Sequence, residues 1–595
     1  MSRIRTLTYG IAITVLCACS SAPNVRQSDA PRTQPVEEQT PVSLSAQQYL
    51  QQARKASAEQ QKNLLLNAAD AFIKEGDCNS SLKLLKPLQA ALDEYEQQDR
   101  ANLLKARCLA NLGHWQLAQQ NLQKVSQRLP LLPKRLALSA ELAEQRGDML
   151  TAASSLAELT TLQPDKETEL QGKIWHLIQQ TPETVLAPQR NTQGALAPWL
   201  QLARITRTAS AEALVEQLHE WQVRHSLALP TDLQSLLQSG SIQPQRIAVI
   251  LPLSGRLASQ GEALKEGILA AYFADQKDSK PQMSFIDTVS LSEQAAADLS
   301  QQYDFVIGPL LKEDLDAILP KLPENLPVLA LNRLDQPSKQ TDRYFYALAP
   351  EDEAEQLAQL LNAKGYQAPL VVNADRAVFQ RMATSFTKMW QSKGNPEPRQ
   401  VSFTDNKSMR SAMEGLLDVG HSKQRIKQVE KLAKEEIHSF ARNRRDIDAI
   451  VVFASAAQTE LLNPIIESSI SPFAELVPVY ASSRSFSQEL GGNSFRDLRH
   501  MTFLDMPWML PGEDSQLKTL NKQLWPQRND GQNRLFAMGH DAYNILPALL
   551  QMATVPQMTK QGLTGELRMD EFNQLRRSLP LGKVEQERVI RIAMD

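Results

Sequence analysis

The feature that most constrains the fold of this 595-residue chain is a change in its hydrophobic pattern near residue 240. Before this point apolar residues recur at the spacing of amphipathic helices, and after it they form short continuous runs. These patterns are typical of packed helices and of buried parallel strands, respectively. The segment Gly240-Ser-Ile-Gln-Pro244 marks the change. We therefore expect a multidomain protein, with an all-α domain over residues 44–241 and an α/β domain over residues 245–595.

The helical half contains a degenerate repeat. Three segments rich in small residues end at Gly76, Gly113 and Gly147, which are 37 and 34 residues apart. Each glycine is expected to end one helix before a second amphipathic helix begins. The period is similar to that of tetratricopeptide repeats, although the full aromatic signature is missing. We expect TPR-like helical repeats, with a further helix around residues 211–225.

The second half alternates apolar runs with helical stretches over about 350 residues. This alternation predicts an α/β domain with parallel sheets, and its length favours two lobes. A helix is expected from Gly261 to Asp275. The predicted strands are Arg246–Pro252, Phe305–Gly308, Pro327–Leu331, Pro369–Val372, Ala449–Phe453 and Val477–Tyr480.

The N-terminus has the pattern of a lipoprotein export signal. Arg3 and Arg5 precede an apolar run that ends in Leu16-Cys-Ala-Cys19-Ser20. The run is too short to span a bilayer, which takes roughly 20 apolar residues. We expect residues 1–18 to be removed, Cys19 to be acylated and the Pro-rich residues 19–43 to form a disordered tether. An ordinary secretory signal is the alternative. Ser20, rather than Asp, after the cysteine favours the outer membrane, with the chain facing the periplasm.

Export would leave Cys78 and Cys108 as the two internal cysteines. An oxidising compartment favours a disulfide between them, because the repeat pattern places them near neighbouring helices. The alternative is a pair of buried thiols, since free cysteine behaves as a small hydrophobic residue.

The composition argues against several function classes. The chain carries 64 Lys+Arg against 67 Asp+Glu, which gives no electrostatic footprint for nucleic acid. Zinc-protease, nucleophile-elbow and Walker motifs are absent from the sequence. Ser80…Lys83 and Ser385…Lys388 match Ser-x-x-Lys, but no Lys-Thr-Gly accompanies them. We predict no catalytic residues, no metal site and no cofactor.

Residues Arg246 to Tyr272 resemble the opening of type I periplasmic binding proteins of the branched-chain amino acid group. Leu253-Ser-Gly255 matches the turn after the first strand, and Gly267-Ile-Leu-Ala-Ala matches the following helix. Further landmarks are Val306-Ile-Gly308-Pro, Tyr346-Ala-Leu-Ala-Pro350-Glu-Asp-Glu at the crossing into the second lobe, Met538-Gly-His-Asp541-Ala and Leu563-Thr-Gly565-Glu-Leu. This resemblance implies a bilobed α/β fold over residues 245–595.

The whole order of signal, tether, helical repeats and binding-protein-like domain resembles the family of outer-membrane lipoprotein activators of class A penicillin-binding proteins. Arg444-Arg-Asp-Ile-Asp-Ala-Ile-Val-Val-Phe also fits this family. The resemblance implies a regulator that is not an enzyme. It would bind a class A penicillin-binding protein through its C-terminal domain and stimulate transpeptidation in peptidoglycan synthesis. Peptidoglycan itself is a further candidate partner.

Two sets of residues are candidates for binding. In open α/β folds ligands bind outside the carboxyl ends of the strands, where this chain has Ser254, Asn332, Asp375, Ser455 and Ser482. Asn332 and Ser482 suit helix caps equally well. A basic segment, Lys423 to Arg445, offers Arg442, Arg444 and Arg445 as a patch for an acidic partner, with a solvated helix face as the alternative.

Two other functions compete with the regulator. A solute receptor for amino-acid-like ligands, serving a transporter or sensor, would explain the C-terminal half. It would explain neither the helical repeats nor the sorting signal. The second competing hypothesis is a pure scaffold whose repeats bind several partners.

Overall fold

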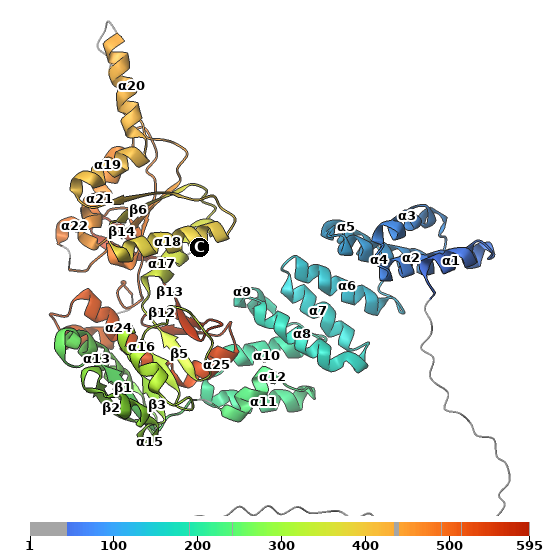
Figure 1. Cartoon of the computed structure of the whole chain (residues 1–595), viewed down its shortest axis with the longest axis horizontal. Coiled ribbons are helices and arrows are strands. Elements are labelled where there is room, and N and C mark those ends of the chain that lie inside the picture. The colour runs from blue at the N-terminus through green and yellow to red at the C-terminus, as the bar shows by residue number, and fades with distance from the viewer. Residues whose placement is uncertain are drawn as a thin grey trace, which may run out of the picture. The chain divides into compact units, whose positions relative to one another are not determined.

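The computed structural model describes residues 44–189, 191–240, 242–432, 439–489, 491–512 and 515–593. Contacts divide the chain into two compact units, one ending at His114 and the other beginning at Trp115. Figure 1 shows the helical segments and the two α/β lobes. The predicted signal peptide, the tether and Cys19 lie outside the described residues.

The first unit is a small helical domain. Its described helices are α1 (Ala46–Ala53), α2 (Ala58–Lys74), α3 (Cys78–Leu88), the 3-10 helix η1 (Gln89–Ala91) and α4 (Tyr95–Asn111). Helix α2 packs against α1, α3 and α4. Leu66 of α2, Leu85 of α3 and Leu104 of α4 meet in one buried cluster, which gives this unit a core of its own.

The predicted repeat glycines end their helices in the same way. Gly76, Gly113 and Gly147 all have positive φ, between +76° and +83°. After each glycine, the next backbone N–H donates to a carbonyl five residues back: Asp77 to Phe72 at 2.8 Å, His114 to Leu109 at 2.8 Å and Asp148 to Ala143 at 2.9 Å. This is the Schellman motif, which favours glycine because an L side chain is strained at positive φ. The repeated helix ends predicted from the sequence are confirmed.

Cys78 and Cys108 are two buried free thiols in the structure, so the disulfide favoured above is not formed there. The Asn111 amide donates to Cys78 Sγ at 3.6 Å. Burial, with a further contribution from Cys78, raises the pKa of the Cys108 thiol to about 12. The pair therefore matches the alternative of small hydrophobic residues at a helix seam.

The second unit begins with helices rather than at the α/β boundary near residue 241. Its helices before the lobes are α5 (Trp115–Leu122), α6 (Leu132–Gln145), α7 (Met149–Thr160), α8 (Glu167–Gln180), α9 (Glu183–Leu186), α10 (Ala197–Thr208), α11 (Ala211–His225) and α12 (Thr231–Ser239), with 3-10 helices η2 (Pro164–Lys166) and η3 (Ala187–Gln189). Trp175, Trp199 and Trp221 belong to the same buried cluster as strand residues of the first lobe. Residues 115–239 are thus packed into one compact unit with the lobes.

Lobe 1 contains an eight-stranded sheet in the order β11-β12-β13-β5-β4-β3-β1-β2. Its strands are β1 (Arg246–Leu251), β2 (Gln282–Asp287), β3 (Phe305–Ile307), β4 (Val328–Ala330), β5 (Arg343–Tyr346), β11 (Thr559–Gly562), β12 (Gly565–Met569) and β13 (Gln574–Ser578). Its helices are α13 (Ala258–Ala274), α14 (Glu293–Ala297), α15 (Leu299–Gln302), α16 (Lys312–Ile318), α24 (Asp530–Asn544) and α25 (Leu549–Thr554), with 3-10 helices η4 (Gly255–Leu257), η5 (Thr288–Ser290), η6 (Leu319–Lys321) and η8 (Leu546–Ala548).

Lobe 2 contains a seven-stranded sheet in the order β15-β14-β10-β9-β8-β6-β7. Its strands are β6 (Pro369–Ala374), β7 (Arg399–Phe403), β8 (Ala449–Phe453), β9 (Val479–Ala481), β10 (Thr502–Leu504), β14 (Leu581–Glu585) and β15 (Arg588–Ile592). Its helices are α17 (Pro350–Ala363), α18 (Ala377–Ser392), α19 (Asn406–Leu416), α20 (Val419–Leu432), α21 (Ala456–Ser469), α22 (Gly492–Asp497) and α23 (Gln516–Leu524), with the 3-10 helix η7 (Ser483–Ser485).

All six predicted strands are present, and those that pair with one another do so in parallel. Strand β8 has the predicted bounds, and α13 covers most of the predicted helix over residues 261–275. The C-terminal strands were missed because β11 to β15 are short, carry many polar residues and mostly pair antiparallel. Their burial alternates along most of the strands, so they lack a continuous apolar run.

Two glycines allow α13 and α24 to touch along their backbones. A Cβ added at Gly267 would lie 2.0 Å from the Phe536 carbonyl oxygen, and one at Gly539 would lie 2.1 Å from that of Leu264. Both glycines belong to sequence landmarks quoted above. Asp541, two residues after Gly539, accepts hydrogen bonds from the backbone N–H groups of Leu563 and Thr564, each at 2.8 Å. The separated landmarks thus meet in lobe 1.

Candidate functional site: the cleft and hinge between the lobes

Three chain segments connect the two lobes. The first runs from β5 to α17, the second leaves β10 at Asp505 and returns to α24, and the third joins β13 to β14 at Leu579 and Pro580. The predicted crossing at Tyr346 to Glu353 is the first of these and is confirmed. This arrangement places the carboxyl ends of β3, β4 and β5 beside the start of α17.

A cleft of about 660 Å³ lies at this junction. Asn332 and Arg333 line it from the end of β4, Glu351 from the start of α17 and Arg381 from α18. Leu535 and Met538 of α24 supply apolar lining. The cleft therefore corresponds to the position at which open α/β folds bind ligands, and its volume is that of a small-molecule site.

The charged groups of the cleft are already paired with one another. Arg381 Nε lies 2.6 Å from Glu351 Oε1, and Arg333 Nη2 lies 3.6 Å from Glu351 Oε2. Arg333 Nη1 also contacts Asp352 Oδ1 at 2.7 Å. Burial would raise the pKa of Glu351, but the hydrogen bond from Arg381 and the charge of Arg333 outweigh it, and the pKa is lowered. Glu351 is thus an ionised carboxylate that is paired with the arginines of the cleft.

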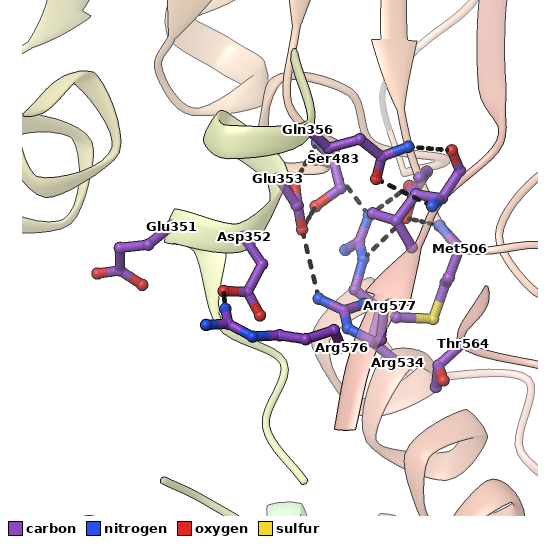
Figure 2. A network of polar contacts seen from close by, with 12 residues as sticks. Glu351, Asp352, Glu353, Gln356, Ser483, Met506, Arg534, Thr564, Arg576 and Arg577 are labelled. Carbon is purple, nitrogen blue, oxygen red and sulfur yellow. Dashed lines mark hydrogen bonds and ion pairs between the residues drawn. The ribbon is translucent and has the colours of Figure 1, made fainter. Parts of the chain in front are cut away.

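Figure 2 shows how the first turn of α17 continues this network into the hinge. Asp352 pairs with Arg576 of β13, which also contacts Asp570 at 3.0 Å. Glu353 accepts hydrogen bonds from the N–H and the hydroxyl of Ser483, both at 2.9 Å, and lies 3.9 Å from Arg577. Consecutive acidic residues at a helix N-terminus suit the helix dipole. Here they also join lobe 2 to the last strand of lobe 1.

Two further contacts fix the other connections. The Gln356 amide donates to the Leu579 carbonyl at 2.8 Å and accepts from the Leu579 N–H at 3.0 Å. Arg534 of α24 lies 2.7 Å from Asp505 and donates to the Ser483 carbonyl at 3.2 Å. Burial raises the pKa of Asp505 to about 6, although Arg534 opposes this rise. All three connections therefore carry side-chain contacts of this network.

The predicted cleft residues lie in different places in the structure. Asn332 lines the cleft, but its side chain is engaged: its amide donates to the Leu310 carbonyl at 2.9 Å and its oxygen accepts from the Arg333 N–H at 2.9 Å. The other four candidates do not line this cleft, although all lie in the described part of the chain. Ser455 is the N-cap of α21 in a capping box. They do not form one site.

The remaining three candidates have other surroundings. Ser254 is exposed and hydrogen-bonds Asp287, which lowers the pKa of that carboxyl group. Asp375 is exposed and accepts a hydrogen bond from Gln380. Ser482 precedes η7 and is fully buried, with no side-chain partner among the described residues. None of the three contributes to the ion pairs of the cleft.

The predicted basic patch is only partly available to a partner. Arg442 and Arg445 are exposed, but Arg444 donates from Nε to Asp446 Oδ1 at 2.6 Å. The guanidinium of Arg444 holds the pKa of Asp446 at about 2. Arg444 therefore belongs to an ion pair, and the cationic surface reduces to Arg442 and Arg445.

An exposed aromatic pair lies beside this surface. Phe440 is 58% exposed and Phe473 is 80% exposed, with ring centroids 5.4 Å apart. Asn443 holds the two segments together by accepting a hydrogen bond from the Ser471 N–H at 3.0 Å. We call Phe440, Arg442, Arg445 and Phe473 the outer patch, because they precede β8 and β9 and lie at the amino ends of these strands.

Sequence reasoning missed the ion pairs of the cleft and hinge. Arg333, Arg381 and Arg534 stand singly in segments without a motif, so only the acidic run after Pro350 gave a signal. Among the described residues no cluster of His, Cys, Asp or Glu could hold a metal ion, and no helix is long and apolar enough to cross a membrane.

This architecture defines a bilobed type I periplasmic-binding-protein-like domain that follows TPR-like helices. The sequence model of the "LppC putative lipoprotein" family matches residues 39–582, so the chain belongs to this lipoprotein family. The chain is 30% identical over 593 residues to a penicillin-binding protein activator LpoA of Vibrio vulnificus, with 95% of this chain and 96% of the relative covered.

Two further matches extend over nearly the whole chain. A penicillin-binding protein activator LpoA of Vibrio cholerae is 29% identical over 591 residues, which cover 95% of each chain. A solved structure of LpoA from Haemophilus influenzae matches with a TM-score of 0.64 at 22% identity, covering 92% of this chain and 98% of that one. The structural match supports the fold, and the sequence matches support the family.

Proposed function

We propose that this chain is a non-enzymatic activator that binds a class A penicillin-binding protein and stimulates its transpeptidase activity. The observation that carries this proposal is the similarity of the whole chain, helices and lobes together, to relatives named penicillin-binding protein activators. The paired charges of the cleft support a regulator over a solute receptor, because Glu351 already neutralises Arg333 and Arg381.

The proposed anchor is a lipid on Cys19, followed by the tether of residues 19–43, in the outer membrane. Anchoring would hold the chain in the periplasm at a raised effective concentration near its partner. Binding can favour a cross-linking-competent state of the synthase only by the difference in affinity for its two states. Peptidoglycan is retained as a second candidate partner.

The C-terminal domain is the proposed docking domain, and the outer patch is the proposed contact. Exposed arginines attract an acidic partner surface, and aromatic rings supply apolar contact area. The hinge side of the lobes is less suited to docking, because its arginines are partly or fully buried and paired with carboxylates.

The direct test combines the purified full chain with a class A penicillin-binding protein from the same organism. We expect co-purification and increased peptide cross-linking in a peptidoglycan synthesis assay. The Arg442→Glu/Arg445→Glu double variant should weaken both. Its matched control is Lys407→Glu/Arg410→Glu, the same charge change at two exposed positions on α19. Absence of binding by the unaltered chain would contradict the proposed function.

The cleft volume keeps the receptor alternative testable. Tight binding of a solute raises the unfolding temperature by mass action. A thermal-shift series with the standard amino acids should leave the unfolding temperature unchanged. A reproducible increase with one amino acid that disappears in Arg333→Ala would favour the receptor.

A further inference from the structure

A groove of about 710 Å³ lies on lobe 1, away from the interlobe cleft. It is formed where the start of α11 and the segment leading into β1 approach the sheet: Glu212, Ile242 and Lys277 lie along it together with Tyr543, Pro547 and Lys560. In Figure 1, α12 lies next to α25, and α11 contacts the 3-10 helix η8 that precedes α25. None of the activities discussed above uses this groove.

The groove runs beside an edge strand. Strand β11 is the outermost strand of its sheet and pairs antiparallel with β12, Lys560 opposite Leu567 and Gly562 opposite Gly565. Lys560, Gln561 and Gly562 all line the groove. Successive side chains of a strand point to opposite faces, so three consecutive lining residues show that the groove includes the backbone of β11. Leu567 of β12, which pairs with Lys560, continues the lining onto one face of the sheet.

The outer edge of β11 is available for pairing. In the described part of the chain no other strand pairs with it, and the backbone groups of residues 559–562 have no hydrogen bonds beyond the β12 ladder. An open edge of this kind offers unpaired N–H and C=O groups that match an extended peptide. A compact small molecule would not use this row of groups.

The walls of the groove add specificity. Ile242, Pro244 and Pro547 provide apolar contacts for the side chains of a peptide. Lys277 is paired with Glu212 at 2.8 Å, whereas Lys560 has no ion-pair partner among the described residues. Three carboxylates also line the groove, and each has a partner: Glu212 pairs with Lys277, Asp275 accepts from Tyr543, and Asp541 accepts from the N–H groups of Leu563 and Thr564. Lys560 is thus the cation left to pair with an acidic residue of an extended segment.

The groove is held in shape by the packing of the helices on lobe 1. Gln551 of α25 donates to the carbonyls of Thr206 at 2.9 Å and Ala209 at 3.2 Å. Tyr543 donates to Asp275 at 2.9 Å on the groove lining. A preformed site loses less conformational entropy on binding, which favours recognition of a flexible segment.

We propose that this groove binds an extended, acidic segment of the penicillin-binding protein, which adds to lobe 1 as a strand beside β11. The proposal rests on the proposed function, because it assigns the segment to that partner. It adds a second contact to the outer patch, which lies on the other lobe.

Hydrogen–deuterium exchange of the full chain, alone and saturated with the penicillin-binding protein, tests this contact. Backbone amides on the free edge of β11 should exchange at least about tenfold more slowly in the complex, because hydrogen bonding to an added strand protects them. If the complex forms and protects other segments while residues 559–562 exchange unchanged, the groove proposal fails and the proposed function stands. If no complex forms, the proposed function fails, and the groove loses the partner assigned to it.

A charge reversal provides the second measurement. Lys560→Glu should weaken binding of the penicillin-binding protein about fivefold, the effect of one exposed ion pair. Lys339→Glu is the matched control, since Lys339 is an exposed lysine of the same lobe outside the groove. Equal affinities of the two variants would overturn the role of Lys560. An unchanged unfolding temperature shows that any loss is not caused by misfolding.

Discussion

The hinge side and the outer end of lobe 2 use arginine in opposite ways. At the hinge, Arg333, Arg534 and Arg577 are partly or fully buried and contact carboxylates of their own chain. At the outer patch, Arg442 and Arg445 are exposed beside the aromatic pair of Phe440 and Phe473. At the position used for ligands in this fold class, the arginines contact carboxylates of the chain itself. Recognition is then expected on the outer surface.

Removing the cation from the buried Asp505 carboxylate should have the largest effect. Arg534→Ala leaves the Asp505 carboxylate buried without its cation, which costs about 3–5 kcal/mol of unfolding free energy. Urea unfolding at pH 7.5, followed by circular dichroism, measures this loss. A loss below about 1 kcal/mol would show that the hinge pairs contribute no more than surface pairs do.

The same pair predicts a dependence on pH. The folded pKa of Asp505, about 6, lies above its ordinary value of 3.8, so the folded protein binds this proton more tightly than the unfolded chain does. The contribution of this proton to stability is therefore complete below pH 4 and is lost as the pH rises through about 6.

The loss caused by Arg534→Ala should accordingly be smaller at pH 5 than at pH 7.5, because Asp505 can take up a proton at the lower pH. Unfolding curves of the unaltered chain and the variant at both pH values give this difference directly. A loss independent of pH would mean that Asp505 is not the group that titrates.

A substitution on the outer patch should affect binding and leave folding unchanged. Phe473→Ala removes an aromatic ring that is 80% exposed, so the unfolding free energy should stay within about 0.5 kcal/mol. Affinity for the penicillin-binding protein should fall about tenfold, as expected for an aromatic residue at the centre of an interface. Surface plasmon resonance measures the affinity. Exposed Leu520, changed to Ala, is the control.

The smallest effect is expected in the cleft. Arg381 is 59% exposed, so its pair with Glu351 is screened and Arg381→Ala should cost less than about 1 kcal/mol. Binding of the penicillin-binding protein should not change. A large loss of binding in this variant would move recognition back to the cleft and contradict the comparison.

The sequence predicted the elements that have a strong local pattern. Three kinds of feature could be predicted because each depends on neighbouring residues. They are the Schellman glycines, the buried runs that form β1 and β8, and the crossing at Tyr346–Glu353. The ion pairs of the hinge could not be predicted from the sequence. Asp352 and Arg576, for example, are separated by 224 residues, and no local pattern around either residue indicates that the two are in contact.

The boundary between the two compact units also could not be predicted from the sequence. The Schellman motif at Gly113 lies in the first compact unit and the one at Gly147 lies in the second, although their local patterns are alike. Similar helix ends therefore do not show in which hydrophobic core a helix packs. Four of the five candidates for the cleft, all except Asn332, lie outside it for a related reason: residue type and strand position do not determine whether side chains converge.

The strand order of the two lobes has a consequence for how the chain assembles. The sheet of lobe 1 needs β11, β12 and β13, and the sheet of lobe 2 needs β14 and β15, yet all five strands come from residues 559–592. A polypeptide that emerges with its N-terminus first leaves β5 and β10 without the neighbouring strands β13 and β14 until these last residues arrive. Residues 44–114 contain a complete core and can therefore fold before the last residues of the chain are synthesised. Loss of the final thirty or so residues would therefore leave two unfinished lobes rather than one shortened lobe.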